Sequence, residues 1–305
     1  MSRIEAGKTM THNRQNPAAS GADAGFSWRK MDRRKIPPAE KLLRDRELWC
    51  VTACGRFSGF LKQHSSTDAV WTLCGRDGIH ALIIYINRNV LPVFCGNTQI
   101  PNPAFINRVF GILPVHSVQG LRDEVIFVED YLSTCGLRTA DRIDYDLMYI
   151  DTPPDSNGFS AGPADLIVRV ARNADFNELA VLQAGYEQEE VLPQGAVFNP
   201  AVGRLNMEKI FANEQLLVAE LGGRLVGKIN TSAHSFTRFQ IGGVYVLPSF
   251  RGMGIARRMA TEFVSALIKQ GRGVSLFVKK SNPPAISVYR RLGFKFLADY
   301  RITYY

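Results

Sequence analysis

Hydrophobic and polar positions along the 305-residue chain follow two spacings, one typical of helices and one typical of strands. In the first half, apolar residues recur at helical spacing over 39–62 and predict an amphipathic helix that is interrupted near Gly55. Three apolar runs follow at 69–74, 79–86 and 90–95, separated by short polar turns. These runs predict a meander of β-hairpins.

The rest of the first half predicts two further helices and a strand. Asn102 is placed to cap a helix that begins at Pro103, because a proline at the first helical position has no N–H to lose there. A second helix is predicted over 121–132, and a short strand near 144–150. The polar, proline- and glycine-rich run 151–158 has the composition of a linker, so a domain boundary is predicted there.

In the second half the spacing again predicts helices and strands. Asp175 is placed to cap a helix that runs to about Glu190. The segment 255–269 is strongly amphipathic, with its apolar residues on one face. The other predicted elements are a short helix over 204–212, strands over 216–221, 225–232, 244–246 and 274–278, a helix that carries Tyr289, and a closing strand over 295–304.

The segment 242–256 reads as an apolar strand that enters a glycine-rich turn and opens a helix. A helix N-terminus leaves its first backbone N–H groups unpaired and carries the positive end of the helix dipole, so anionic phosphates bind there. Gly252 and Gly254 keep bulky side chains away from that backbone. The pattern predicts a pyrophosphate cradle, with an ordinary loop as the alternative.

A second motif lies in 282–294, about thirty residues after the first. Its helix is expected to stop at Gly293. One helical face carries Ala285, Val288, Tyr289 and Leu292.

Together the two motifs resemble those of the GNAT acetyltransferase superfamily. In that family the first motif is Arg or Gln, two residues, Gly, one residue, then Gly or Ala, which Arg251, Gly254 and Ala256 match. The second is Asn, two residues, Ala, three residues, Tyr, three residues, then Gly-Phe. Its fixed positions are matched by Asn282, Ala285, Tyr289, Gly293 and Phe294. The resemblance covers roughly residues 166–305 and implies a mixed α/β (α+β) acyl-CoA N-acyltransferase fold there.

The first half resembles such a fold in element order alone, as in two-domain bacterial acetyltransferases that carry a degenerate module. After the strand predicted at 90–95, the run 96–101 lacks the glycine pair. The first half would then be a smaller, degenerate GNAT-like α+β domain, with an unrelated α+β domain as the alternative. The predicted organisation is a disordered basic tail over 1–38, this degenerate domain over 39–152, a linker over 153–164 and an N-acetyltransferase domain over 165–305.

The resemblance implies acetyl-CoA as cosubstrate and no metal. The pantetheine arm would pair with the backbone of Val244, Tyr245 and Val246. The pyrophosphate would meet the turn and the helix start, made of Arg251, Gly252, Met253, Gly254, Ile255, Ala256 and Arg257. For the remaining phosphate, the candidates are Arg257, Arg258 and Lys279, each of which is also open to a plain role as a solvated surface charge.

Tyr289 is the predicted general acid. Phenol and thiol both titrate above neutrality, so a tyrosine beside the sulfur is protonated and is reasonably matched to the thiolate that it protonates. The alternative is a core aromatic residue on a helix. Asn282 would order its loop or contact the cofactor or the acceptor.

The general base is left open. Some family members carry a glutamate at the head of the cofactor strand, where this chain has Gln240, which accepts no proton at working pH. The alternatives are Glu187, Glu189, Glu190, His234 or a relay of water, with a solvated or structural role as the other interpretation of each side chain. The acidic run 186–190 in a basic protein would favour a cationic amine.

Composition adds three expectations. The net charge of +9 raises the question of nucleic acid, but the first 38 residues hold eight basic and three acidic residues, so most of the excess lies in the tail. The polar N-terminus and the absence of long apolar runs predict a cytoplasmic protein with no membrane contact. The cysteines have no zinc-like spacing and are expected to be reduced. Cys50 and Cys54 lie one helical turn apart, a spacing more typical of a buried apolar face than of half a metal site.

The sequence therefore predicts an acetyl-CoA-dependent N-acetyltransferase that transfers an acetyl group to an amine by direct attack. A catalytically silent acyl-CoA-binding or interaction protein is the main alternative, and a nucleic-acid-associated protein acting through its tail is the third. The acceptor, a small molecule or a protein amine, is left open, as is homodimerisation.

Overall fold

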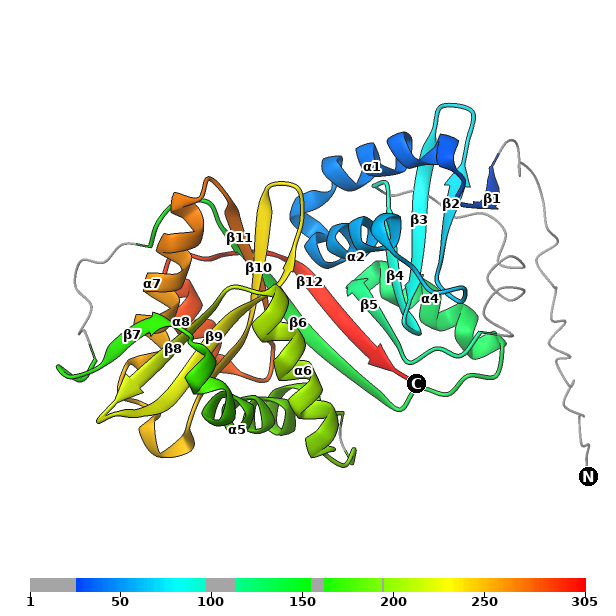
Figure 1. Cartoon of the computed structure of the whole chain (residues 1–305). Coiled ribbons are helices and arrows are strands. Elements are labelled where there is room, and N and C mark those ends of the chain that lie inside the picture. Colours follow the sequence, from blue (N-terminus) through cyan, green and yellow to red (C-terminus); the bar gives the residue numbers. More distant parts are fainter. Residues whose placement is uncertain (1–25, 97–112, 155–161, 194) are drawn as a thin grey trace, which may run out of the picture.

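The computed structural model describes residues 26–96, 113–154, 162–193 and 195–305 (Figure 1). Several predictions fall outside these residues. They are most of the tail, the helix from Pro103 with its Asn102 cap, nearly all of the turn at 96–101, and the centre of the linker.

The first half of the chain begins with a strand, two helices and a three-stranded meander. Its strands are β1 (Ser27–Lys30), β2 (Ala69–Cys74), β3 (Ile79–Ile86), β4 (Asn89–Phe94), β5 (Ser117–Leu121) and β6 (Asp141–Ile150). Its described α-helices are α1 (Ile36–Asp45), α2 (Val51–Lys62) and α4 (Arg122–Thr134).

The second half repeats this order of strands, and its helix α7 (Ile255–Lys269) lies between the fourth and fifth of them; most of the corresponding stretch of the first half, 97–112, lies outside the described residues. Its strands are β7 (Ile167–Val170), β8 (Leu216–Leu221), β9 (Arg224–His234), β10 (Arg238–Val246), β11 (Gly273–Lys279) and β12 (Lys295–Tyr304). Its α-helices are α5 (Phe176–Tyr186), α6 (Pro200–Asn213), α7 (Ile255–Lys269) and α8 (Pro283–Arg291), with a π-helical segment, Glu187–Val191, directly after α5.

All twelve described strands form one sheet in the order β1-β2-β3-β4-β5-β12-β6-β11-β10-β9-β8-β7. Strand β6 of the first half lies between β11 and β12, and β12 lies between β5 and β6. Each half thus places its last strand beside the fifth strand of the other half, and these two long strands join the two halves in Figure 1. The predicted division at 153–164 stays a prediction, and the hydrogen-bonded sheet continues across it.

Two strand pairs are parallel, β4 with β5 and β10 with β11. Parallel neighbours need a crossover connection, which α7 supplies between β10 and β11. Helix α7 buries the apolar face predicted for it against one side of the sheet, together with α8. Helices α5 and α6 cover the other side of the sheet. Successive residues of β10 point to opposite faces, so Tyr245 packs with α5 and α6 whereas Val246 packs with α7.

The mixed α/β fold class agrees with the prediction, and the bounds of the meander, α7, β8 and β12 do so closely. The helix predicted over 39–62 is indeed interrupted, but at the short 3-10 turn Glu47–Trp49 rather than near Gly55. Gly55 lies inside α2, where a Cβ atom would come within 2.8 Å of the His234 carbonyl oxygen. The glycine is explained by close packing of α2 on β9, not by a break.

Two other expectations need correction. The segment 26–38, assigned to the disordered tail, contains β1 and the start of α1, with Asp32 accepting a hydrogen bond from the backbone N–H of Arg34. Asp175 does not cap α5 with its side chain. It forms an ion pair with Arg169, at 2.7 Å, and accepts a hydrogen bond from the N–H of Arg172.

The two halves also meet at the turn between β9 and β10. The buried Glu47 carboxylate accepts hydrogen bonds from the Ser235 hydroxyl (2.6 Å) and from the Thr237 N–H (2.6 Å) and hydroxyl (2.7 Å). The Thr52 hydroxyl donates to Gln240 Oε1 at 3.0 Å. The first half therefore supports the beginning of β10.

Two further expectations concern the state of the cysteines and contact with a membrane. All five cysteines are free thiols, with Cys54 buried and its sulfur 3.7 Å from that of Cys50. Among the described helices none is both long and apolar enough to cross a membrane.

Candidate active site

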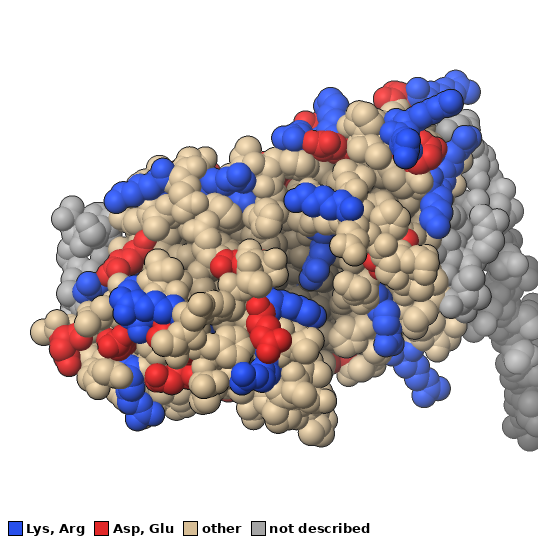
Figure 2. All heavy atoms as spheres, viewed as in Figure 1, with Lys and Arg blue, Asp and Glu red and all other residues tan. Residues whose placement is uncertain are grey.

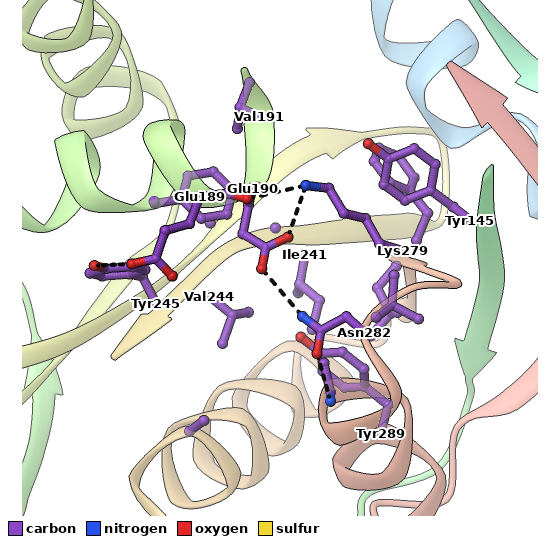
Figure 3. A pocket seen from close by; sticks show the side chains of 18 of the residues that line it. Tyr145, Glu189, Glu190, Val191, Ile241, Val244, Tyr245, Lys279, Asn282 and Tyr289 are labelled. Carbon is purple, nitrogen blue, oxygen red and sulfur yellow. Dashed lines mark hydrogen bonds and ion pairs between the residues drawn. The ribbon is translucent and has the colours of Figure 1, made fainter. Parts of the chain in front are cut away.

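A pocket of about 570 Å³ opens between β10 and β11 (Figure 3). The parallel ladder between these strands starts at Arg238 and Gly273 and ends at Gln240 and Ser275. Beyond that point the two strands line the pocket from opposite sides, over 241–246 and 276–279. The backbone edge of β10 that would have paired with β11 is thereby left facing the pocket.

A β-bulge shapes this part of β10. Gly242 lies opposite Asn230 and Tyr245 opposite Lys228, so two residues of β10 face a single residue of β9. One of these two residues is Gly243, whose φ of 56° is the left-handed conformation that glycine adopts in such bulges. The bulge interrupts the ladder with β9 beside the pocket.

Lys228 occupies the space beneath the bulge and is fully buried. Its Nζ donates hydrogen bonds to the Gly243 carbonyl oxygen (3.0 Å) and to Asn230 Oδ1 (2.8 Å). Burial lowers the pKa of Lys228 to about 7, an effect that nearby Glu187 opposes. Lys228 is not among the site residues predicted from the sequence, although a lysine beside the apolar residues of β9 is a visible signal.

The predicted cradle is a turn between β10 and α7. Gly252 and Gly254 have φ angles of 78° and 81°, and Gly254 is the N-cap of α7. A Cβ atom at Gly252 would meet no described atom within 4 Å, so the left-handed backbone, rather than lack of space, calls for glycine there. Arg251 holds the turn through its Nε, which donates to the Val246 carbonyl oxygen at 3.0 Å.

The structure brings most of the predicted cofactor residues to one place. Those that line the pocket are Val244, Tyr245, Val246, Arg251, Ala256, Asn282 and Tyr289. Gly252, Met253, Gly254 and Arg257 lie in the adjoining turn and first helical turn, while the Ile255 side chain is buried in the core under α7. Arg258, a phosphate candidate, forms an ion pair with Glu262 of the same helix.

Tyr289 projects from α8 into the pocket and is 8% exposed. Its ring packs edge-on against Phe294, with 5.7 Å between the centroids. Within the described chain its hydroxyl has no hydrogen-bond partner. Burial raises the pKa of Tyr289 well above the ordinary tyrosine value, so the phenol stays protonated through neutral pH.

The three carboxylates of the acidic segment are all engaged. Glu189 accepts a hydrogen bond from the Tyr245 hydroxyl (2.9 Å) and pairs with Arg251 (2.7 Å). Glu190 pairs with Lys279 (3.4 Å) and accepts a hydrogen bond from Asn282 (3.2 Å), which Figure 3 shows reaching across the pocket.

Glu187 does not line the pocket and is buried between α5 and α6. Its Oε1 accepts hydrogen bonds from Gln183 (2.7 Å) and Asn206 (3.0 Å). His234 and Gln240 also lie outside the pocket lining. Of the carboxylates proposed as bases, only Glu189 and Glu190 reach the pocket.

Asn282 and Lys279 have definite structural partners. The Asn282 side-chain oxygen accepts the Ala285 N–H at 3.2 Å and so caps α8, while its nitrogen donates to Glu190. Lys279 donates to the Glu189 carbonyl oxygen at 3.2 Å in addition to pairing with Glu190. Lys279 thus bridges to the π-helical segment, an arrangement that gives no support to its assignment as a phosphate ligand.

The pocket also has an aromatic wall that the sequence analysis did not anticipate. Its aromatic residues are Tyr145, Tyr186, Phe277 and Tyr304, and Ile302 lies among them. No local signal could have identified it, because β6 and β12 reach the pocket only through the strand order of the sheet. Among the described residues, no group of three or more His, Cys, Asp or Glu side chains is placed to hold a metal ion.

The split pair of parallel strands, the bulge in β10 and the glycine-rich turn before α7 lie within one segment of the chain, 238–279. Residues 185–294 match the acetyltransferase (GNAT) family, which places a GNAT acetyltransferase domain in this part of the chain. The match supports acyl-CoA-dependent acyl transfer.

Solved structures of similar fold cover both halves. A GCN5-related N-acetyltransferase from Sphaerobacter thermophilus is 19% identical, with 91% of this chain and 94% of that chain covered at a TM-score of 0.58. A tandem GNAT protein from the clavulanic acid biosynthesis pathway is 13% identical, with 91% of this chain and 97% of that chain covered at a TM-score of 0.58. A Drosophila protein is 9% identical, with 91% of this chain and 98% of that chain covered at a TM-score of 0.64. No curated protein matches the chain. At these identities the likeness shows the fold alone.

Proposed function

We propose that this protein is an acetyl-CoA-dependent N-acetyltransferase that transfers an acetyl group to an amine by direct attack on the thioester. The observation that carries the proposal is the convergence of two features on one pocket. The left-handed glycine turn at the start of α7 and the unpartnered hydroxyl of Tyr289 both adjoin the cleft between β10 and β11.

The chain supplies two backbone elements that suit acetyl-CoA. Beyond Gln240 the edge of β10 is free of β11, so its amides are available to an extended pantetheine chain. The N-terminus of α7 offers unpaired N–H groups and a positive dipole end to the pyrophosphate. Both contacts use backbone, and neither requires a side chain of particular chemistry.

In the proposed reaction the acceptor nitrogen forms a bond to the thioester carbonyl carbon and the carbon–sulfur bond breaks. Tyr289 gives its proton to the departing thiolate. The acceptor ammonium must lose one proton to become a nucleophile and a second as the amide forms. We assign acceptance of the first proton to Glu190, which lines the pocket opposite Tyr289, and the second passes to solvent. Solvent returns a proton to Tyr289 after the transfer.

We further propose that the first half is a related module without a cofactor site. Its sheet repeats the order of the second half, and β4 diverges from β5 after the pair Val90 and Val118, as β10 does from β11. There the Glu124 carboxylate accepts hydrogen bonds from the Phe94 N–H (3.1 Å) and from Arg46 (3.1 Å). An internal carboxylate thus takes up a strand-edge N–H at the place where the second half has its pocket.

A direct test is release of thiol from acetyl-CoA that depends on an added amine, with the acetylated product identified by mass. Saturable binding of acetyl-CoA without turnover for any amine would favour the silent binder instead. On the face seen in Figure 2, Lys and Arg are interspersed with Asp and Glu over both halves; residues 1–25 of the tail, through which the nucleic-acid alternative would act, lie outside the described residues.

A further inference from the structure

The part of the pocket built by β6, β11 and β12 is aromatic. Tyr145 of β6 packs edge-on against Phe277 of β11, with ring centroids 5.3 Å apart, and Phe277 stacks on Tyr300 of β12 at 4.9 Å. Ile302 and Tyr304 extend the same wall along β12. Tyr145, Phe277 and Tyr304 thus bring rings from three adjacent strands to the pocket lining, and Tyr300 packs behind Phe277 in the same cluster.

Tyr145 is the residue that β6 contributes to this wall, and its ring carries a hydroxyl. It lies opposite Lys279 on one side and Tyr300 on the other, so it shares a sheet face with the residues that line the pocket. Tyr145 is 6% exposed, and its hydroxyl has no hydrogen-bond partner in the described part of the chain. Because Tyr145 lines the pocket, its ring and its hydroxyl are both available to a ligand bound there.

The charges of the pocket argue against a polycationic acceptor. Its carboxylates, Glu189 and Glu190, are paired with Arg251 and Lys279, which line the same pocket. Two acidic and two basic side chains leave no net charge to attract several ammonium groups. The sequence-based preference for a cationic amine rested on the acidic segment alone and loses its basis once these pairs form.

We propose that the acceptor is an aromatic monoamine, a primary amine joined by a short chain to an aromatic ring, and that Tyr145 is a specificity-determining residue for it. The ring would lie against Tyr145, Phe277 and Tyr304, in the edge and offset contacts that aromatic pairs favour. The amine would point toward Glu190 and the thioester. This inference rests on the proposed function, and it makes a strand of the first half part of the acceptor site.

The first test compares acceptors on the unmodified full-length protein. Thiol release from acetyl-CoA is measured with 2-phenylethylamine, spermidine and lysine amide. We expect kcat/KM for 2-phenylethylamine to exceed that for the other two by about ten-fold or more, the usual worth of a matched apolar contact. Equal or better use of spermidine or lysine amide would overturn the acceptor assignment while leaving the acetyltransferase function intact. Absence of acetyl-CoA binding, or of thiol release with every amine, would contradict the proposed function itself.

The second test uses variants on β6. Tyr145→Ala should raise KM for 2-phenylethylamine about ten-fold or more, with the Kd for acetyl-CoA changed less than about two-fold. Tyr145→Phe keeps the ring and separates the contribution of the hydroxyl. Tyr149→Ala removes a tyrosine from the same strand but outside the pocket lining, and should behave as the parent does. An unchanged KM in folded Tyr145→Ala would remove Tyr145 from the acceptor site.

Discussion

Tyr289 meets the requirements of a proton donor, because it faces the pocket, lacks a protein partner among the described residues and stays protonated. We expect Tyr289→Phe to preserve packing on Phe294 and to lower kcat by about 10²–10⁴, the usual contribution of a positioned general acid. The Kd for acetyl-CoA should change less than about three-fold. Steady-state kinetics and calorimetry measure the two quantities.

The matched control is Tyr85→Phe. Tyr85 is a buried tyrosine of the first half whose hydroxyl donates to the Pro114 carbonyl oxygen, away from the pocket. This variant should turn over like the parent. A Tyr289→Phe protein that is equally active would show that water or another group protonates the thiolate.

Lys228 gives a prediction about stability and pH. The pKa of Lys228 is about 7 in the folded protein, compared with 10.5 for a free side chain. Between these two pH values the Lys228 amine is protonated in the unfolded chain and neutral in the folded protein. Stability therefore rises with pH over this window, and the gain is absent below about pH 7, where both states are protonated.

Lys228→Met keeps the length of the side chain and removes the titrating group. We expect the unfolding free energy of the parent, minus that of the variant, to increase by about 2 kcal/mol from pH 7 to pH 9. Other titrating groups are shared and cancel in this difference, which urea unfolding at several pH values can measure. A constant difference would mean that Lys228 is charged in the folded protein throughout.

The start of α7 is where an anion should bind, and Gly254 is its N-cap. Gly254→Asp places a carboxylate there, so we expect acetyl-CoA affinity to fall at least ten-fold in calorimetry because like charges repel. Gly271→Asp is the control for backbone strain, since Gly271 has a similar φ of 74° just past the other end of the same helix. Equal affinity in the two variants would contradict the phosphate cradle.

The molecule as a whole should hold one acetyl-CoA. The two halves repeat one strand order, but among the described residues the Phe94 N–H at the edge of β4 donates to Glu124, whereas the edge of β10 beyond Gln240 faces the pocket. Calorimetry on the full-length protein should give one site per chain, and Gly254→Asp should weaken that site. Two sites, or a site whose affinity this substitution leaves unchanged, would show that the first half binds acyl-CoA.

Several features could be predicted from the sequence because nearby residues decide them. The apolar face of α7 comes from spacing within one helix, and the left-handed turn comes from Gly252 and Gly254 themselves. Asn282 and the proline after it mark the start of α8 in the same way. These local features carry the family resemblance and the assignments of the cofactor turn and Tyr289.

Pairing between distant residues was decided only in the folded protein. The register of β6 between β11 and β12 brings Tyr145 to the pocket, across more than 130 residues from Lys279. Two glutamates of the acidic segment that suggested a cationic acceptor, Glu189 and Glu190, are paired with Arg251 and Lys279. The Lys228 amine donates to the Gly243 carbonyl oxygen at the bulge. Strand order and side-chain pairing depend on contacts between segments far apart in the chain, and hydrophobic spacing alone carries no record of them.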